Sequence, residues 1–167
     1  GWNWEITLND LEHNVTGKRR KNNKEKIINF VNTDASLKRI KFIYYDLPKT
    51  FLKFKKFFGV YLYYELWQIG IYNHIKTNVE IKQFDVVHHI TFGVFRQPSH
   101  LYKFKIPFVF GPLGGGEMMP KKILEDFSLK YRLIENTRKI INNISLNRTA
   151  LKECFKNSSL IFARTNE

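Results

Sequence analysis

A glycine-rich segment, residues 111–117, is the strongest local signal for chemistry in this sequence. It follows the apolar run at 107–110 and contains three consecutive glycines, Gly114, Gly115 and Gly116. Glycine allows positive φ angles and leaves no side chain in the way, so a ligand can approach backbone N–H groups closely, above all where a helix begins next. The loop suits a phosphate or a sugar hydroxyl, and a tight strand-to-helix turn without a ligand is equally compatible.

Four further side chains near this loop in sequence could act on a ligand. Glu117 could hydrogen-bond a hydroxyl, or it could simply favour the positive end of a helix dipole. His88 and His89 end a strand-like run, where an imidazole can exchange protons near neutral pH. Adjacent strand residues point to opposite faces, so at most one of the two faces a given ligand. Arg96 could pair with phosphate or carboxylate, or form a surface salt bridge.

Charge and cysteine content limit the class of protein. The chain of 167 residues carries a formal net charge of +13, which predicts attraction to nucleic acid, an anionic membrane or a phosphorylated ligand. Its one cysteine, Cys154, cannot form a disulfide framework or a zinc site and favours a reducing compartment. No uncharged apolar stretch is long enough to predict a transmembrane helix. We expect no metal site.

Strand-like and helix-like patterns alternate along the chain. Unalternated apolar runs predict buried strands, and their alternation with helices indicates an α/β fold with a doubly wound, Rossmann-like parallel sheet and helices on both faces. The aromatic stripe of the longest helix fits a core, with a membrane-surface helix as the alternative. The expected strands are 14–16, 40–45, 85–90, 107–110 and 159–163, and the expected helices 2–11, 22–32, 51–78, 99–105 and, in two or three pieces, 121–156.

Taken together, these segments resemble the N-terminal domain of family 4 glycosyltransferases, which have the GT-B fold. The specific part is residues 84–117, where FDVVHHITF, FRQPS and IPFVFGPLGGGE occur in the order and spacing of one subgroup. Segments FIYYDLP at 42–48, LYYELWQ at 62–68 and GWNW at 1–4 extend the likeness along the chain. The chain departs from the pattern at 17–20, where GKRR replaces a more apolar sequence.

The resemblance implies the acceptor-side half of an enzyme that transfers a sugar, with retention of configuration, from a nucleotide-sugar co-substrate to a glycan or lipid-linked acceptor, as in polysaccharide biosynthesis. His88, with His89 second, would contact the transferred sugar or the acceptor, while Arg96, Gly114, Gly115, Gly116 and Glu117 would bind substrate. No metal or other cofactor is implied. A first strand before residue 1 and a C-terminal domain with the donor site would be missing, so residues 1–167 would be a partial domain.

Two other function classes remain open. A non-catalytic basic module for nucleic acid or anionic membrane fits the net charge, although no nucleic-acid motif is present and we expect no nucleic-acid partner. A Rossmann oxidoreductase is disfavoured because the loop is not G-x-G-x-x-G, and it also lacks the Lys and Ser/Thr of a P-loop. We expect a cytoplasmic protein, with peripheral contact to the inner face of an anionic membrane through the lysine-flanked helix at 51–78.

Overall fold

The computed structural model describes residues 4–8, 28–30, 32–33, 40–45, 47–90 and 93–164. The chain divides into two compact units, Gly1–Phe57 and Phe58–Glu167. The expected strand at 14–16 and the basic cluster at 18–21 lie outside the described residues. Within the described part of the expected helix at 22–32, residues 28–30 are helical.

The first unit contains a two-stranded parallel sheet. Strand β1 (Trp4–Leu8) pairs with β2 (Ile40–Tyr44), with Trp4 opposite Ile40 and Leu8 opposite Tyr44. The predicted strand at 40–45 is confirmed, whereas the predicted helix at 2–11 is wrong for residues 4–8. Apolar and polar residues alternate from Trp4 to Leu8, and this two-residue period is the pattern of a strand.

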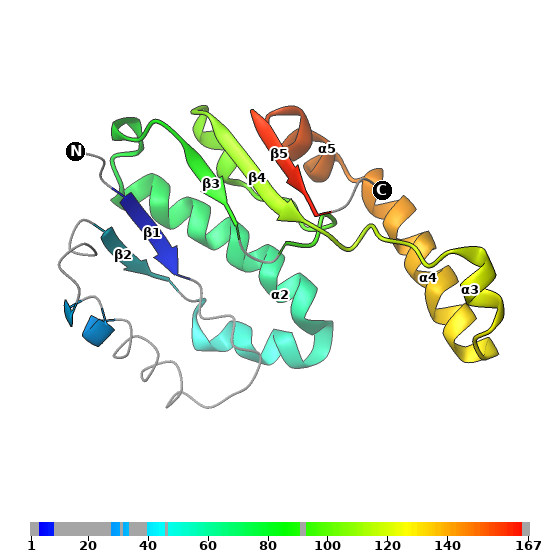
Figure 1. Ribbon diagram of the computed structural model, residues 1–167. Coiled ribbons are helices and arrows are strands. Elements are labelled where there is room, and N and C mark those ends of the chain that lie inside the picture. The colour runs from blue at the N-terminus through cyan, green and yellow to red at the C-terminus, as the bar shows by residue number, and fades with distance from the viewer. Residues whose placement is uncertain are drawn as a thin grey trace. The chain divides into compact units, whose positions relative to one another are not determined.

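The second unit is built on a three-stranded parallel sheet in the order β3-β4-β5 (Figure 1). The strands are β3 (Val87–His89), β4 (Phe108–Leu113) and β5 (Leu160–Ala163). His88 lies opposite Val109 in the register, and Phe110 lies opposite Ile161. The structure confirms strands at the three predicted places. The predicted burial is wrong for β5, which is exposed along its length, and for His88 of β3. The protein is therefore of mixed helix and strand, compatible with an α/β fold.

Helix α2 (Lys49–Asn78) enters this unit and is interrupted at Gly59, whose φ of 80° and ψ of 174° are not helical. Part of its aromatic stripe is core: Tyr64 is 1% exposed and Trp67 5%. Tyr61 of the same stripe is 49% exposed, so the core interpretation holds for Tyr64 and Trp67, and membrane contact by this helix stays a prediction.

The remaining helices follow the strands. The short 3₁₀ helices η2 (Ile81–Gln83) and η3 (Leu101–Phe104) flank β3, and η3 lies within the helix predicted at 99–105. After β4 the chain forms α3 (Lys121–Glu125), α4 (Leu129–Leu146) and α5 (Thr149–Lys156), where two or three helical pieces were expected between 121 and 156. Helices α3 and α4 form a hairpin that projects from one end of the sheet (Figure 1).

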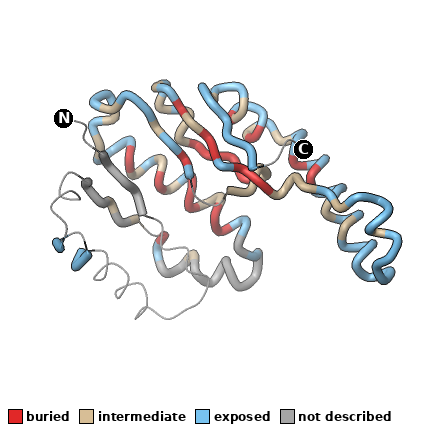
Figure 2. Tube along the Cα trace, viewed as in Figure 1, coloured by how far each residue is buried: buried red, intermediate tan, exposed pale blue. Residues whose placement is uncertain are grey.

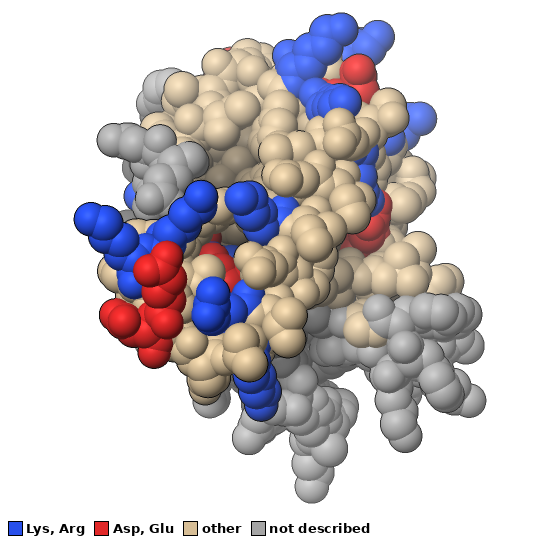
Figure 3. Space-filling model, turned by 90° about the vertical axis from the view of Figure 1, so that its right-hand side faces the viewer, with Lys and Arg blue, Asp and Glu red and all other residues tan. Residues whose placement is uncertain are grey.

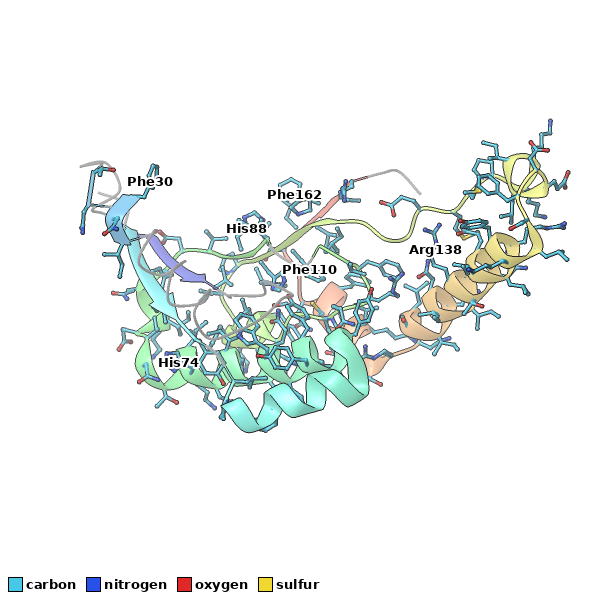
Figure 4. The ribbon with its side chains drawn as sticks, turned by 90° about the horizontal axis from the view of Figure 1, so that it is seen from below. Phe30, His74, His88, Phe110, Arg138 and Phe162 are labelled. Atoms are coloured by element: carbon cyan, nitrogen blue, oxygen red, sulfur yellow. The ribbon has the colours of Figure 1, made fainter. Side chains whose placement is uncertain are left out.

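The core of this unit lies on one face of the sheet. Phe108 and Phe110 are fully or almost fully buried, and Phe110 lies 6.1 Å from the Phe155 ring of α5. Phe110 points toward the helices, whereas His88 and Phe162 lie on the opposite face (Figure 4). Figure 2 shows the buried residues concentrated in β4 and the adjoining helices. Within the described part of this unit helices cover one face only, so the doubly wound arrangement stays a prediction.

Candidate functional site at the carboxyl end of the sheet

The glycine-rich loop leaves β4 at the carboxyl edge of the parallel sheet, which is where open α/β sheets place ligands. The segment after β3 is hydrogen-bonded to this loop. Gly114 N–H donates to Gly93 O at 2.6 Å, and Phe95 N–H donates to Gly114 O at 3.0 Å. On the other side, Arg164 N–H donates to Leu113 O at 2.8 Å. The carboxyl ends of all three strands therefore hold the start of the loop from both sides.

Two side chains from distant parts of the chain bind the Gly115 carbonyl. Arg96 Nη1 donates to Gly115 O at 2.9 Å and also to Asn142 Oδ1, while Asn142 Nδ2 approaches Gly115 O at 3.4 Å. The Arg96 guanidinium lies 5.6 Å from the centre of the Phe95 ring, a cation–π distance. Arg96 is thus fixed at the loop, and among the described residues it forms no surface salt bridge, which was its alternative.

Glu117 closes the loop on itself. Its Oε2 accepts the Gly115 N–H at 2.6 Å. Hydrogen bonds from its own N–H and from Gly115, supported by the charges of Arg164 and Arg138, hold the pKa of this carboxyl below its ordinary value. Glu117 is therefore ionised at neutral pH and accepts hydrogen bonds without serving as a proton donor.

The glycines do not lead directly into a helix, because the next helix begins where the sequence predicted it, at residue 121. Helix α3 starts only at Lys121, is five residues long and has Pro120 as its N-cap. The pKa of Glu117 is therefore lowered by loop hydrogen bonds and nearby arginines, and a helix dipole is not its cause. A proline that starts a new helix requires a preceding segment of extended chain, and this separates the loop from α3.

The three glycines serve different purposes. Only Gly115 has a positive φ, at 83°. A Cβ on Gly114 would lie 2.9 Å from Glu117 Oε1 and 3.1 Å from Arg164 Cδ, so this glycine permits close packing within the protein. A Cβ on Gly116 would meet only the Phe95 ring, at 3.7 Å. Gly116 is the glycine with room beside it.

Helix α4 anchors the segment that follows the glycines. Arg138 Nη2 donates to Glu117 O and, at 2.7 Å, to Glu135 Oε1. Glu135 Oε1 in turn accepts the Met119 N–H at 3.0 Å. Arg138 lies where α4 meets this segment (Figure 4). The loop is thus held between strand ends on one side and a helix on the other.

The two histidines face opposite sides of the sheet, as the alternation of a strand requires. His88 is exposed, and its Nε2 donates to Gly111 O at 2.8 Å, which fixes the hydrogen on that nitrogen because a carbonyl only accepts. Its ring lies 6.2 Å from that of Phe162. His88 therefore sits at the base of the loop, on the sheet face away from the helices.

His89 belongs to the core. It is 7% exposed, its Nε2 lies 3.1 Å from Tyr64 Oη, and its ring meets Phe110 edge-on at 5.4 Å. Gln68 Nε2 donates to the same tyrosine oxygen, and burial raises the pKa of Tyr64 far above its ordinary range. These contacts give His89 a structural role in the core, on the sheet face opposite His88.

The structure thus brings together Arg96, Gly114, Gly115 and Glu117, with Gly116 beside them. His88 binds the carbonyl oxygen of Gly111, which lies in β4 before the three glycines. Sequence reasoning missed the contribution of α4. The signal was present: Glu135, Arg138, Asn142 and Ser145 recur at three- and four-residue spacing, a polar stripe on one helix face.

In the part of the chain that the structure describes, no three His, Cys, Asp or Glu side chains gather as metal ligands would. The helices described there include none with the length and apolarity to cross a bilayer. No family model, curated protein or solved structure matches this chain.

Proposed function

We propose that this chain is the acceptor-side domain of a retaining GT-B glycosyltransferase, which transfers a sugar from a nucleotide-sugar donor to a glycan or lipid-linked acceptor. The observation that carries the proposal is the glycine-rich segment at 111–117, the end of β4 and the loop that follows it. It lies at the carboxyl edge of a parallel sheet, and its backbone is engaged by an arginine, an asparagine and an ionised glutamate. The resemblance to family 4 glycosyltransferases supplies the reaction class.

The chemistry of these side chains suits a sugar acceptor. Glu117, as an ionised acceptor, can take a hydrogen bond from a sugar hydroxyl through the oxygen that does not bind Gly115. Arg96 carries further N–H donors that fit a phosphate or a carboxylate. His88 presents an imidazole on the open sheet face and can orient a hydroxyl or stabilise charge that develops in the transition state. In a retaining transfer these groups would position the acceptor and polarise the reacting atoms, and none of them would act as a nucleophile.

An NMR titration of the 15N-labelled chain tests the proposal. The probes are UDP-glucose, GDP-mannose, a free oligosaccharide, a short-chain polyprenyl phosphate and a short DNA duplex. We expect the oligosaccharide or the polyprenyl phosphate to shift the amides of residues 114–117. Glu117→Gln should weaken binding of the oligosaccharide, which loses a charged acceptor, whereas Glu125→Gln, on the exposed surface of α3, should not.

The alternative, a basic binding module for nucleic acid, predicts a different result. DNA would shift amides next to lysines and arginines, with an affinity that falls steeply as salt rises, and the loop amides would stay in place. That outcome, with no response to any sugar or polyprenyl ligand, would overturn the glycosyltransferase proposal. Transfer itself is measured on the complete gene product, because the resemblance assigns most of the donor site to a second domain.

A further inference from the structure

Arg96 is held at the glycine-rich loop by neutral partners. Its Nη1 donates to Gly115 O and to Asn142 Oδ1, and among the described residues no carboxylate lies within ion-pair distance of its guanidinium. The ionised Glu117 binds the Gly115 N–H instead, and the cations that help to lower its pKa are Arg164 and Arg138. Within the described structure, the positive charge of Arg96 is therefore not neutralised.

Asn142 determines both the position and the charge of this guanidinium. It is 6% exposed, its Oδ1 accepts from Arg96, and its Nδ2 lies 3.4 Å from Gly115 O. An aspartate has nearly the same shape, but its second oxygen would face the Gly115 carbonyl, which is also an acceptor, and its charge would neutralise Arg96. The amide therefore fixes the arginine without supplying a counterion.

The donors that Arg96 leaves unused form a fork. The Nε–H and one N–H of Nη2 run parallel along one edge of the guanidinium, and such an edge binds two oxygens of a carboxylate or a phosphate. Neither nitrogen has a hydrogen-bond partner among the described residues. A Cβ on Gly115 would lie 3.9 Å from Nη2, so this nitrogen borders the space next to the loop backbone. Beside Gly115 the loop thus offers a fixed cation together with the ionised Glu117.

The charge of the surrounding segment also favours an anion. Residues 121–148, which include α4, contain seven Lys or Arg against three Asp or Glu, for a net charge of +4. Figure 3 shows Lys and Arg side chains standing out on the side from which the α3–α4 hairpin projects. Positive charge around a cation that has no counterion raises the local concentration of anionic ligands. The ligand that fits carries an oxyanion for Arg96 and hydroxyls for Glu117.

We propose that Asn142 is a positioning residue, which holds Arg96 to bind the oxyanion of an acidic sugar acceptor. The oxyanion is the carboxylate of a uronic acid or the phosphate of a phosphorylated sugar, because the fork accepts either. This inference rests on the proposed function, from which the role of acceptor comes. It adds that the acceptor is anionic, and it assigns to α4 the residue that maintains this preference.

An NMR titration of the 15N-labelled chain with methyl glucuronide, glucose 6-phosphate and methyl glucoside tests the inference. At least one anionic probe should bind ~10-fold or more tightly than the neutral glucoside and shift the Arg96 Nε–H resonance. The anionic probe that binds more tightly identifies the oxyanion as carboxylate or phosphate. Asn142→Asp should weaken its binding by at least ~10-fold and leave that of the glucoside unchanged. Asn143→Asp adds the same charge at an exposed position and should change neither by more than about twofold.

Three results would overturn the inference. Equal affinity for neutral and anionic probes would reject an anionic acceptor and leave the sugar-binding role of the loop in place. Equal losses in Asn142→Asp and Asn143→Asp would show an effect of overall charge, and no response to any probe would reject the proposed function as well. Protection of the buried Cys154 thiol from labelling shows that each variant is folded. The comparison of probes on the unchanged chain decides the question even if Asn142→Asp does not fold.

Discussion

Replacing Gly115 by alanine, with Gly116→Ala as its matched control, tests how the loop is built. Gly115 has a φ of 83°, and a Cβ there would lie 3.3 Å from Val94 Cγ1. A non-glycine residue in the left-handed region costs about 1–2 kcal/mol. Gly116 lacks a positive φ, and its Cβ would make an ordinary contact with Phe95 at 3.7 Å. Both variants restrict the unfolded chain equally, so their difference in stability isolates the strain.

Urea unfolding and amide exchange measure this difference. A strain of about 1–2 kcal/mol with an m value of roughly 2 kcal/mol/M separates the two midpoints by roughly 0.5–1 M. The amides of Phe95 and Gly114 report on the loop directly, because each donates a hydrogen bond between the loop and residues 93–95. They should exchange about 5- to 30-fold faster in Gly115→Ala. If Gly116→Ala were as destabilising as Gly115→Ala, the assigned loop geometry would be wrong.

Three further predictions follow from buried groups. Asn142→Ala removes an acceptor from Arg96 and a donor from Gly115 O, so it should lower the free energy of unfolding by about 1–3 kcal/mol, whereas Asn143→Ala, exposed, should change it by less than ~0.5 kcal/mol in the same urea assay. His100 is 8% exposed with neither ring nitrogen hydrogen-bonded in the described structure, and burial, then Lys103, lowers its pKa. As the pH is lowered below about 6.5, His100 therefore takes up a proton in the unfolded chain before it does so in the folded one. The free energy of unfolding should decrease over this range, until the pH reaches the lowered pKa of His100 in the folded state. His100→Asn should remove that slope, and a slope kept in full would refute the assignment. Burial raises the pKa of Cys154 to about 11, so about one thousandth of the native thiol is ionised at pH 8, and iodoacetamide should label it only after unfolding. Native labelling as fast as in denaturant would contradict this.

The strands of the second unit could be predicted because their sequences carry the signal locally. Runs such as PFVF at 107–110 are apolar without alternation, and this pattern predicted the strands. Strand β4 continues to Leu113, through Gly111 and Pro112, at which the sequence pattern ended it. The strand at 4–8 was missed because ten residues with scattered aromatic side chains fit both periods, and the choice was decided by pairing with Ile40–Tyr44, far along the chain.

Most residues of the site could be identified from the sequence, but the contacts that hold them in place could not. Arg96, Gly115 and Glu117 were recognised from the loop and its neighbours, and they do contact one another. The role of Asn142 could not be deduced from local sequence, because 27 residues separate it from Gly115 and the turn of the α3–α4 hairpin brings them together. Likewise, the sequence shows that α4 is amphipathic, but which face turns inward depends on the polar partners that the loop supplies.

The Glu117 carboxylate already accepts the Gly115 N–H, so it competes with any ligand for this backbone amide. Any ligand that seeks this amide has to displace a carboxylate that is already 2.6 Å away and tethered two residues along the chain. A neutral hydroxyl oxygen is a weaker acceptor than a carboxylate and loses that contest, whereas a doubly charged phosphate can win it and would send the glutamate elsewhere. If the loop binds a sugar hydroxyl, Glu117 can therefore stay in place, whereas a phosphate that used the Gly115 N–H would have to displace it.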